Sequence, residues 1–143
     1  MAKPDPALFD PARYPFCTDV DVHFGDMDVN RHVNNVALAG FVEEGRVRFH
    51  RDSGFHRAIA GLGAMVVSVG IDFVGQAFYP GVITLHAGAS RIGGTSYDLE
   101  LLLRQDDRTI AFARSVVAVM QDGKPWAIPE SFRNSVQDWM VRA

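Results

Sequence analysis

Two different spacings of apolar residues mark the first half of the chain. Apolar and polar side chains alternate from Cys17 to Phe24, which predicts a half-buried strand. After Asn34 or Asn35, either of which can cap a helix, the spacing changes to that of a helix ending near Arg51 or Asp52. The apolar face expected for this helix consists of Leu38, Phe41, Val42, Gly45 and Phe49.

Most of the second half has the pattern of strands separated by turns. Four strands are predicted, at residues 65–73, 82–89, 97–104 and 110–120, after a connector at 55–63. Short turns between consecutive strands favour an antiparallel sheet, and the 35–51 helix is the only long element available to cover it. We therefore expect an α+β fold in which the sheet is curled around one helix.

The domain organisation is simple. Residues 1–16 are rich in Pro and Asp and are expected to form an N-terminal arm, followed by a single domain at 17–143. The tail after Pro129 is expected to form a short helix around Phe132, Val136 and Trp139 to Met140.

Two glycines lie inside the expected long helix. Gly40 and Gly45 each cost roughly 1 kcal/mol relative to alanine in a helix. Both are explained if the sheet approaches the helix very closely. On the polar face, Glu44 and Arg48 are four residues apart and can form an ion pair.

Composition and charge exclude several classes of protein. With 48% hydrophobic and 22% charged residues, the sequence is not typical of disordered or fibrous chains. The net charge is −3 and no stripe of Lys and Arg occurs, so we expect no nucleic-acid partner. The apolar runs are too short to cross a bilayer, and the N-terminus lacks the apolar segment of a signal peptide. The single cysteine, Cys17, excludes an internal disulfide. The expectation is a cytoplasmic protein without a membrane partner.

The candidate chemistry is concentrated between the first strand and the helix. A carboxylate, an amide and an imidazole stand at Asp28, Asn30 and His32, and two further amides follow at Asn34 and Asn35. A strand end, a polar turn and a helix N-terminus together are typical of a site that binds and converts a small molecule. Each residue also has a structural interpretation: Asp28 and Asn30 as turn residues, His32 as a hydrogen-bonding histidine, and the two later amides as helix caps.

This motif and the order of the elements resemble the hotdog-fold acyl thioesterases over residues 19–129. Asp26-Met27-Asp28 followed by His32-Val33-Asn34-Asn35 is similar to the signature of the 4-hydroxybenzoyl-CoA thioesterase-like group. The string from Asp28 to Asn35 is also close to the catalytic segment of plant acyl-ACP thioesterases. Ile71-Asp72-Phe73 and Tyr79-Pro80-Gly81 resemble the family's second strand and the turn into its third.

The resemblance implies roles for the motif residues. Asp28 corresponds to the catalytic carboxylate, acting as nucleophile or as general base on water, and Asn30 and His32 correspond to residues that assist it. Unpaired backbone N–H groups at Asn34 and Asn35 can stabilise the oxyanion. The implied function is hydrolysis of a fatty or aromatic acyl-CoA without a cofactor or metal, in a homodimer or homotetramer with sites at the subunit interface.

Several positions depart from the family pattern. His23 stands where the family commonly has arginine, Arg31 where glycine is usual, and Leu38 where tyrosine often occurs. The plant enzymes place a further acidic or thiol residue after the second strand, whereas the nearest positions here are Gln76 and Ala77. Asp28 is therefore the sole candidate carboxylate.

The remaining candidates have a simpler second interpretation. Arg91, Thr95 and Ser96 can meet the phosphates of CoA, or they can belong to an ordinary turn. On the helix, Glu43, Glu44 and Arg46 are expected to form a solvated or interface surface. His50 and His56 lack metal-ligand spacing, and Cys17 is expected to be a small apolar residue.

Other functions fit the sequence less well. Gly88 to Ile92 fails the G-x-S-x-G pattern of a serine hydrolase at its last position. A hotdog hydratase or dehydratase uses Asp and His at a spacing that this motif does not reproduce. A non-catalytic acyl-thioester binding protein and an acyl-ACP thioesterase stay open as alternatives.

Overall fold

The computed structural model describes residues 4–143, in which five long strands form one antiparallel sheet with the order β1-β3-β4-β5-β2. A short strand, β6, pairs with β5. The strands are β1 (Phe16–Asp21), β2 (Gly63–Phe73), β3 (Val82–Ile92), β4 (Ser96–Gln105), β5 (Arg108–Gln121) and β6 (Lys124–Pro125). The helices are α1 (Asn35–Asp52), α2 (Phe55–Ala58) and α3 (Glu130–Ser135), and the 3-10 turns are η1 (Pro6–Phe9), η2 (Pro11–Arg13), η3 (Phe24–Asp26) and η4 (Val136–Trp139).

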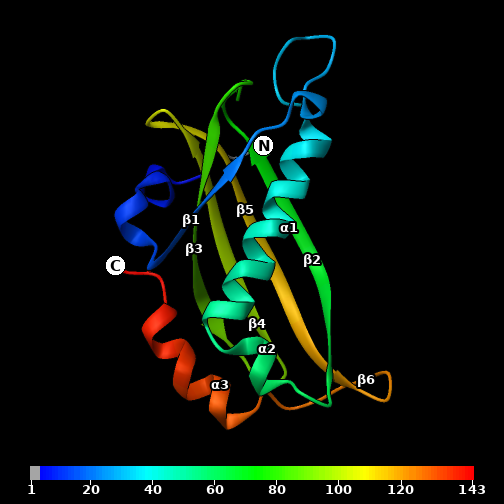
Figure 1. The fold of residues 1–143 in the computed structure, drawn as a ribbon. Coiled ribbons are helices and arrows are strands. Elements are labelled where there is room, and N and C mark those ends of the chain that lie inside the picture. The colour runs from blue at the N-terminus through cyan, green and yellow to red at the C-terminus, as the bar shows by residue number, and fades with distance from the viewer. Residues whose placement is uncertain (1–3) are drawn as a thin grey trace.

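Helix α1 crosses one face of the curled sheet, which confirms the expected α+β arrangement (Figure 1). It packs against β3, β4 and β1. All five residues of its expected apolar face are buried. Within residues 4–143, no helix is long and apolar enough to cross a membrane.

The first strand ends earlier than the alternating pattern predicts. Val22 is still buried, but Phe24 is 74% exposed, so its placement on the buried face was wrong. The chain leaves the sheet because the Asp26 carboxylate accepts a hydrogen bond from the backbone N–H of His23 at 2.7 Å and starts η3. A local polar contact therefore overrides the strand pattern.

Only one of the two helix glycines marks a close approach to the sheet. A Cβ atom on Gly45 would lie 2.6 Å from Leu101 Cδ2 and 3.3 Å from Leu85 Cδ1. A Cβ atom on Gly40 would have no heavy atom within 4 Å, so the expectation for this residue was wrong. Gly40 is exposed, and a methyl group there would meet open space.

The two glycines should respond in opposite directions to alanine. Gly45→Ala should lower the free energy of unfolding by about 1–2 kcal/mol, since overpacking outweighs the gain in helix propensity. Gly40→Ala should raise it by up to about 1 kcal/mol. Urea unfolding of both variants measures the difference, and equal effects would contradict the packing described here.

The connector at 55–63 and the C-terminal tail meet at one end of the sheet. The connector contains a short helix, α2, that the pattern did not reveal. Its first residue, Phe55, is buried against Tyr97 and Phe132, at ring-centroid distances of 5.5 and 4.9 Å. Phe132 belongs to α3, which with η4 confirms the expected short helix in the tail.

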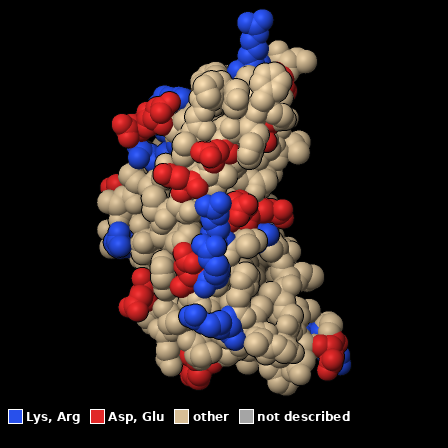
Figure 2. Space-filling view, viewed as in Figure 1, with Lys and Arg blue, Asp and Glu red and all other residues tan. Residues whose placement is uncertain are grey.

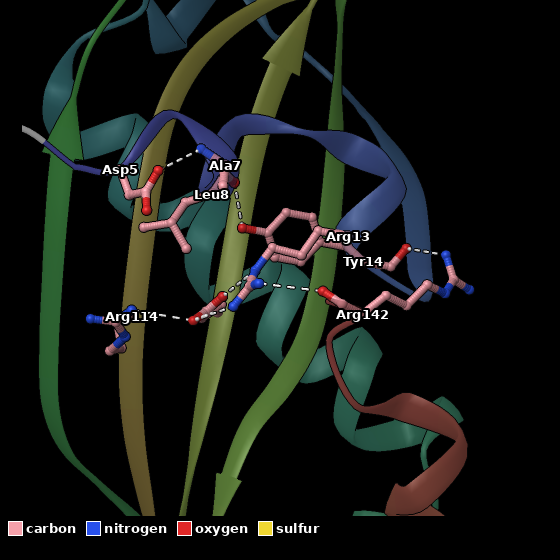
Figure 3. A network of polar contacts seen from close by, with 8 residues as sticks. Asp5, Ala7, Leu8, Arg13, Tyr14, Arg114 and Arg142 are labelled. Atoms are coloured by element: carbon pink, nitrogen blue, oxygen red, sulfur yellow. Dashed lines mark hydrogen bonds and ion pairs between the residues drawn. The ribbon is translucent and has the colours of Figure 1, made fainter.

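The N-terminal arm packs on the face of the sheet opposite α1. Glu100 alternates along β4 with Leu99 and Leu101, which belong to the core under α1, so Glu100 faces away from the helix. Its buried carboxylate accepts hydrogen bonds from Arg13 at 3.1 and 3.3 Å and from Arg114 at 3.2 Å (Figure 3). The arm therefore forms a layer of the fold over residues 4–15, and its first three residues lie outside the described part.

Candidate functional site

The polar motif forms a loop at one end of the sheet, between η3 and α1 (Figure 1). An isolated bridge between Met27 and Val33 closes the loop. The backbone N–H of Val33 donates to the carbonyl of Ala77 at 2.7 Å, and the N–H of Asn34 donates to that of Asp26 at 3.0 Å. The loop is thus held both to itself and to the connection between β2 and β3.

The backbone at Arg31 has a conformation that favours glycine, the residue expected here from the family pattern. Its φ of 64° lies in the left-handed region, which costs a side chain roughly 1–2 kcal/mol. The turn is closed by two backbone hydrogen bonds, from Arg31 N–H to the carbonyl of Asp28 at 3.0 Å and from Asp28 N–H to that of His32 at 3.2 Å. Arg31 therefore adopts the conformation that the turn requires, at some cost to the stability of the fold.

Asp28 is half-buried. Its side chain stabilises the turn and also presents a carboxylate oxygen. Its Oδ1 accepts a hydrogen bond from the backbone N–H of Asn30 at 2.8 Å. Among the contacts of the described residues, none joins its Oδ2 to another protein group. The structural and the catalytic interpretations of this residue are therefore compatible, because one oxygen atom suffices for the turn.

The two expected assistants lie in the same loop but do not contact the carboxylate through their side chains. Asn30 is exposed, and its contact with Asp28 uses the backbone. His32 is half-buried, and its Nδ1 lies 3.1 Å from the carbonyl oxygen of Val33. Within residues 4–143, no side-chain hydrogen bond connects Asn30 or His32 to Asp28. The amide of Asn30 and the second ring nitrogen of His32, Nε2, are left available to a ligand.

The N-terminus of α1 points into this loop. Asn34 is the cap, because its Oδ1 accepts a hydrogen bond from Ala37 N–H at 2.7 Å. Asn35 is the first residue of the helix, so its own N–H lies in the turn that has no intrahelical partner. This N–H and the positive end of the helix dipole suit a developing negative charge.

The two amides should differ in their contribution to stability. Asn34→Ala removes the capping bond and should lower the free energy of unfolding by about 1 kcal/mol. Asn35→Ala serves as the matched control and should leave it nearly unchanged. Thermal unfolding of the two variants measures this, and equal melting temperatures would place the start of the helix elsewhere.

Gln76 and Ala77 are the positions nearest to the further acidic or thiol residue of the plant enzymes, and they lie next to the motif. Ala77 is fully buried and contacts the loop through Val33. The carbonyl of Gln76 accepts a hydrogen bond from Arg108 at 2.8 Å. Neither residue supplies an acid or a thiol. Asp28 is therefore the one carboxylate in the motif loop and in the connection between β2 and β3.

A groove between α1 and β2 was not predicted from the sequence. It has a volume of about 440 Å³ and begins at Val36, directly after the motif. Its mainly apolar walls carry Glu43 and Arg46, and Figure 2 shows charged side chains across the middle of the same face. The residues lining it are Val36, Ala39, Gly40, Val42, Glu43, Arg46, Val66, Val69 and Ile71.

Arg91, Thr95 and Ser96 lie far from the motif. They flank the turn between β3 and β4, whereas the motif lies near the other end of β3, which spans about 30 Å. Arg91 donates to Asp98 at 3.0 Å and to Ser96 at 3.3 Å, and this pairing with Asp98 raises the pKa of its guanidinium. A role in CoA binding thus stays a prediction, and within one chain these residues do not reach Asp28.

Cys17 has no features of an activated nucleophile. Partial burial, together with the nearby carboxylate of Asp19, raises the pKa of its thiol. A raised pKa reduces the fraction of thiolate at neutral pH. Asp28 therefore keeps its place as the candidate reactive group.

Comparison with known families gives a match over most of the chain. The model of the Thioesterase-like superfamily matches residues 22–139, which include the whole motif loop, α1 and the sheet from β2 onward. No protein in a curated set matches the chain.

Solved structures share the fold, which is the hotdog fold expected from the motif. The PA5185 protein from Pseudomonas aeruginosa is 24% identical, with a TM-score of 0.81 over 92% of this chain and 95% of that one. A predicted thioesterase from Bacillus stearothermophilus is 23% identical, with a TM-score of 0.81 over 90% and 98%. A thioesterase from Thermus thermophilus, complexed with coenzyme A and Zn, is 22% identical, with a TM-score of 0.79 over 87% and 93%.

Proposed function

This chain belongs to the thioesterase-like superfamily, and we propose that it hydrolyses acyl-CoA thioesters to the free acid and CoA with Asp28 as the reactive carboxylate. The observation that carries the proposal is that Asp28 lies in the loop leading into the N-terminus of α1, whose second residue, Val36, lines the α1/β2 groove. The coenzyme A bound to the Thermus thermophilus thioesterase supports CoA as the carrier.

The geometry of the loop supports a role for Asp28 in attacking the thioester carbon. Its Oδ1 is fixed by the N–H of Asn30, while Oδ2 is available to attack the carbonyl or to take a proton from water. In the first case a mixed anhydride forms as CoA thiolate leaves, and water then hydrolyses the anhydride to release the acid and restore the Asp28 carboxylate. In the second, water adds directly to the carbonyl and the same thiolate leaves.

The helix N-terminus is suited to bind the thioester oxygen. The N–H groups of Asn35 and Val36 lie in the first turn of α1 without intrahelical partners, while the N–H of Ala37 donates to the Asn34 side chain. A hydrogen bond to the developing oxyanion is worth about 3–4 kcal/mol of transition-state stabilisation. We infer that His32 and Asn30, whose side chains do not contact Asp28, orient the water or the thioester.

The exposed edge of the sheet supports a homodimer. β2 is a terminal strand of 11 residues with exposed apolar side chains such as Met65, Val67 and Val69. A long apolar edge strand is prone to pair with another chain. Pairing of β2 with β2 of a second copy would protect this edge and close the side of the α1/β2 groove.

The test is release of thiol from a panel of acyl-CoAs that varies in chain length and includes benzoyl esters. Saturable release from any member supports the proposal. Tight binding of acyl-CoA without release would instead establish a non-catalytic binding protein, which the absence of a second acid near Ala77 favours as the alternative. Faster cleavage of acyl-ACP than of the matching acyl-CoA would reassign the carrier.

A further inference from the structure

The connection between β2 and β3, residues 74–81, is bonded both to the β4–β5 hairpin and to the motif loop. Its first two residues donate their backbone N–H groups to the carbonyl of Ile110 on β5, at 2.9 and 3.0 Å. Farther along the connection, the carbonyl of Ala77 accepts the hydrogen bond from Val33 of the motif loop. A contact that fixes this connection therefore also fixes one side of the motif loop.

Gln105, the last residue of β4, makes two hydrogen bonds to a single residue of this connection. Its Oε1 accepts from the backbone N–H of Phe78 at 2.8 Å, and its Nε2 donates to the carbonyl of Phe78 at 2.9 Å. Gln105 is only 3% exposed, so water competes little for these bonds. A buried amide that uses both its acceptor and its donor on one residue fixes the backbone there.

Gly81 leaves the space that the Gln105 amide occupies. A Cβ atom at this position would lie 2.6 Å from Gln105 Nε2 and 3.1 Å from the carbonyl oxygen of Phe78. Atoms cannot approach so closely, so a methyl group here would push the amide away from Phe78. The glycine of the Tyr79-Pro80-Gly81 turn is thus explained by space, and that space is needed for the Gln105 contact.

A continuous series of hydrogen bonds connects the Gln105 amide to the backbone of Asp28. The peptide group preceding Phe78 donates through its N–H to Gln105 and accepts through its carbonyl from the N–H of Val33, at 2.7 Å. The peptide group between His32 and Val33 continues the series, because its carbonyl accepts from the N–H of Asp28 at 3.2 Å. Both peptide groups are trans and planar, so the N–H and the carbonyl of each point in opposite directions. Hydrogen bonds in such a series strengthen one another, and a displacement at one end is passed to the other.

We infer that Gln105 is a positioning residue for the reaction, and that it holds Asp28 and His32 in their working geometry through the peptide group preceding Phe78. The inference rests on the proposed thioesterase function. Among the hydrogen bonds of residues 4–143, none joins Gln105 directly to Asp28 or His32, so it acts on them through the backbone. A displacement of about 1 Å in a reacting group can lower the rate by about 10²-fold, even when its cause lies away from the chemistry.

Gln105→Leu removes both hydrogen bonds to Phe78 and keeps a side chain of similar size. At a temperature at which wild type and variant are both fully folded, kcat for acyl-CoA hydrolysis should fall by about 10–100-fold. The KM should change little, because Gln105 does not line the α1/β2 groove. Gln121→Leu, at the opposite end of the sheet, is the matched control and should leave kcat unchanged. A lower melting temperature with wild-type kcat in Gln105→Leu would show a merely structural residue and overturn the inference.

Gln105→Glu is the conservative variant that should restore part of the activity. Its carboxyl group keeps an acceptor for the N–H of Phe78, and when protonated it also donates to the carbonyl of Phe78. Burial raises the pKa of a carboxyl group, so the ratio of variant to wild-type kcat should rise as the pH is lowered from about 8 to 6. Equal losses of kcat in Gln105→Glu and Gln105→Leu across this range would show that the hydrogen bonds do not carry the effect, and would overturn the inference.

Amide hydrogen exchange needs no substrate, so it separates failure of this inference from failure of the proposed function. In Gln105→Leu the N–H of Val33 should exchange several-fold faster than in wild type. The N–H of Val119, bonded to the carbonyl of Thr95 at the opposite end of the sheet, should keep its rate. If no thioester is cleaved but Val33 loses protection, the proposed function fails and the hold of Gln105 on the loop stands. If thioesters are cleaved while the protection of Val33 and kcat are both unchanged in Gln105→Leu, the inference is wrong and the thioesterase stands.

Discussion

Replacing Asp28 with asparagine is expected to lower kcat for acyl-CoA hydrolysis by about 10²–10⁴-fold, the usual contribution of a general base, and by more if the carboxylate is the nucleophile. Asparagine is preferable to alanine because its side-chain oxygen can still accept the 2.8 Å hydrogen bond from the N–H of Asn30. The loop should therefore keep its shape, and melting should change little.

A neighbouring carboxylate supplies the matched control. Asp26 lies two residues away, and its Oδ2 accepts a hydrogen bond from the N–H of His23 at 2.7 Å, which starts η3. Asp26→Asn should retain most of the activity, with at most a modest loss of stability. Initial rates of thiol release for the two variants give the comparison. Wild-type turnover in Asp28→Asn would remove this residue from the reaction.

The two chemical roles of Asp28 can be distinguished by where oxygen from water is incorporated. In a single turnover in water enriched in ¹⁸O, label found in Asp28 identifies a nucleophilic carboxylate, because water that attacks the aspartyl carbonyl of the mixed anhydride leaves its oxygen there. A general base leaves the label only in the released acid. Mass spectrometry of the peptide that contains Asp28 separates these outcomes.

Acid should destabilise the protein through His50, and this is the second large effect that we expect. Burial, reinforced by the nearby charges of His56 and Arg46, lowers the pKa of His50 from its ordinary 6.5 to about 3. Between these values the unfolded chain binds a proton that the folded protein does not. The contribution of His50 to the free energy of unfolding is therefore fully present above about pH 6.5. It falls by about 1.4 kcal/mol per pH unit as the pH drops toward 3.

The contribution of His50 can be isolated from that of the carboxylates, which also titrate in acid. His50→Gln removes the titrating group, so the free energy of unfolding should depend less steeply on pH between 6 and 4 than it does in wild type. By pH 4 the difference amounts to an order of 3 kcal/mol. His56→Gln, at an exposed neighbouring position, removes only one of the nearby charges and should change this slope less than His50→Gln does. Parallel curves for wild type and His50→Gln would show that the buried ring does not resist protonation.

The helix and most strands could be predicted because their signals are local. Asn34 caps α1 through a bond that spans three residues, and the spacing of apolar residues on α1 follows from its own periodicity. The end of β1 could not be predicted, because it depends on the Asp26 side chain competing with the sheet for the backbone of His23. Gly40 and Gly45 look alike in the sequence, and only the distance to Leu101 distinguishes them.

The candidate site also has one part that could be predicted from local sequence and one part that could not. Asp28, Asn30 and His32 lie within one short loop, so their proximity follows from the sequence itself. The α1/β2 groove joins residues on α1 to Val66, Val69 and Ile71 on a strand that follows later in the chain, and no local pattern relates them. The apolar segment at 65–73 has the composition of a central strand but lies at the edge of the sheet, where several of its apolar side chains are exposed.

The hydrogen bonds that hold the N-terminal arm also determine when the arm can dock during synthesis of the chain. Arg142 donates its backbone N–H to the carbonyl of Arg13 at 2.8 Å and its guanidinium to that of Ala12 at 3.1 Å, while Arg13 donates to the carbonyl of Arg142 at 3.3 Å. A ribosome makes residues 12 and 13 first but releases residue 142 only at the end of this segment. The arm therefore waits for almost the whole sheet to be translated before it can dock fully. A fusion that displaces Arg142 should accordingly loosen residues at the opposite end of the sequence and make them the first target of a protease.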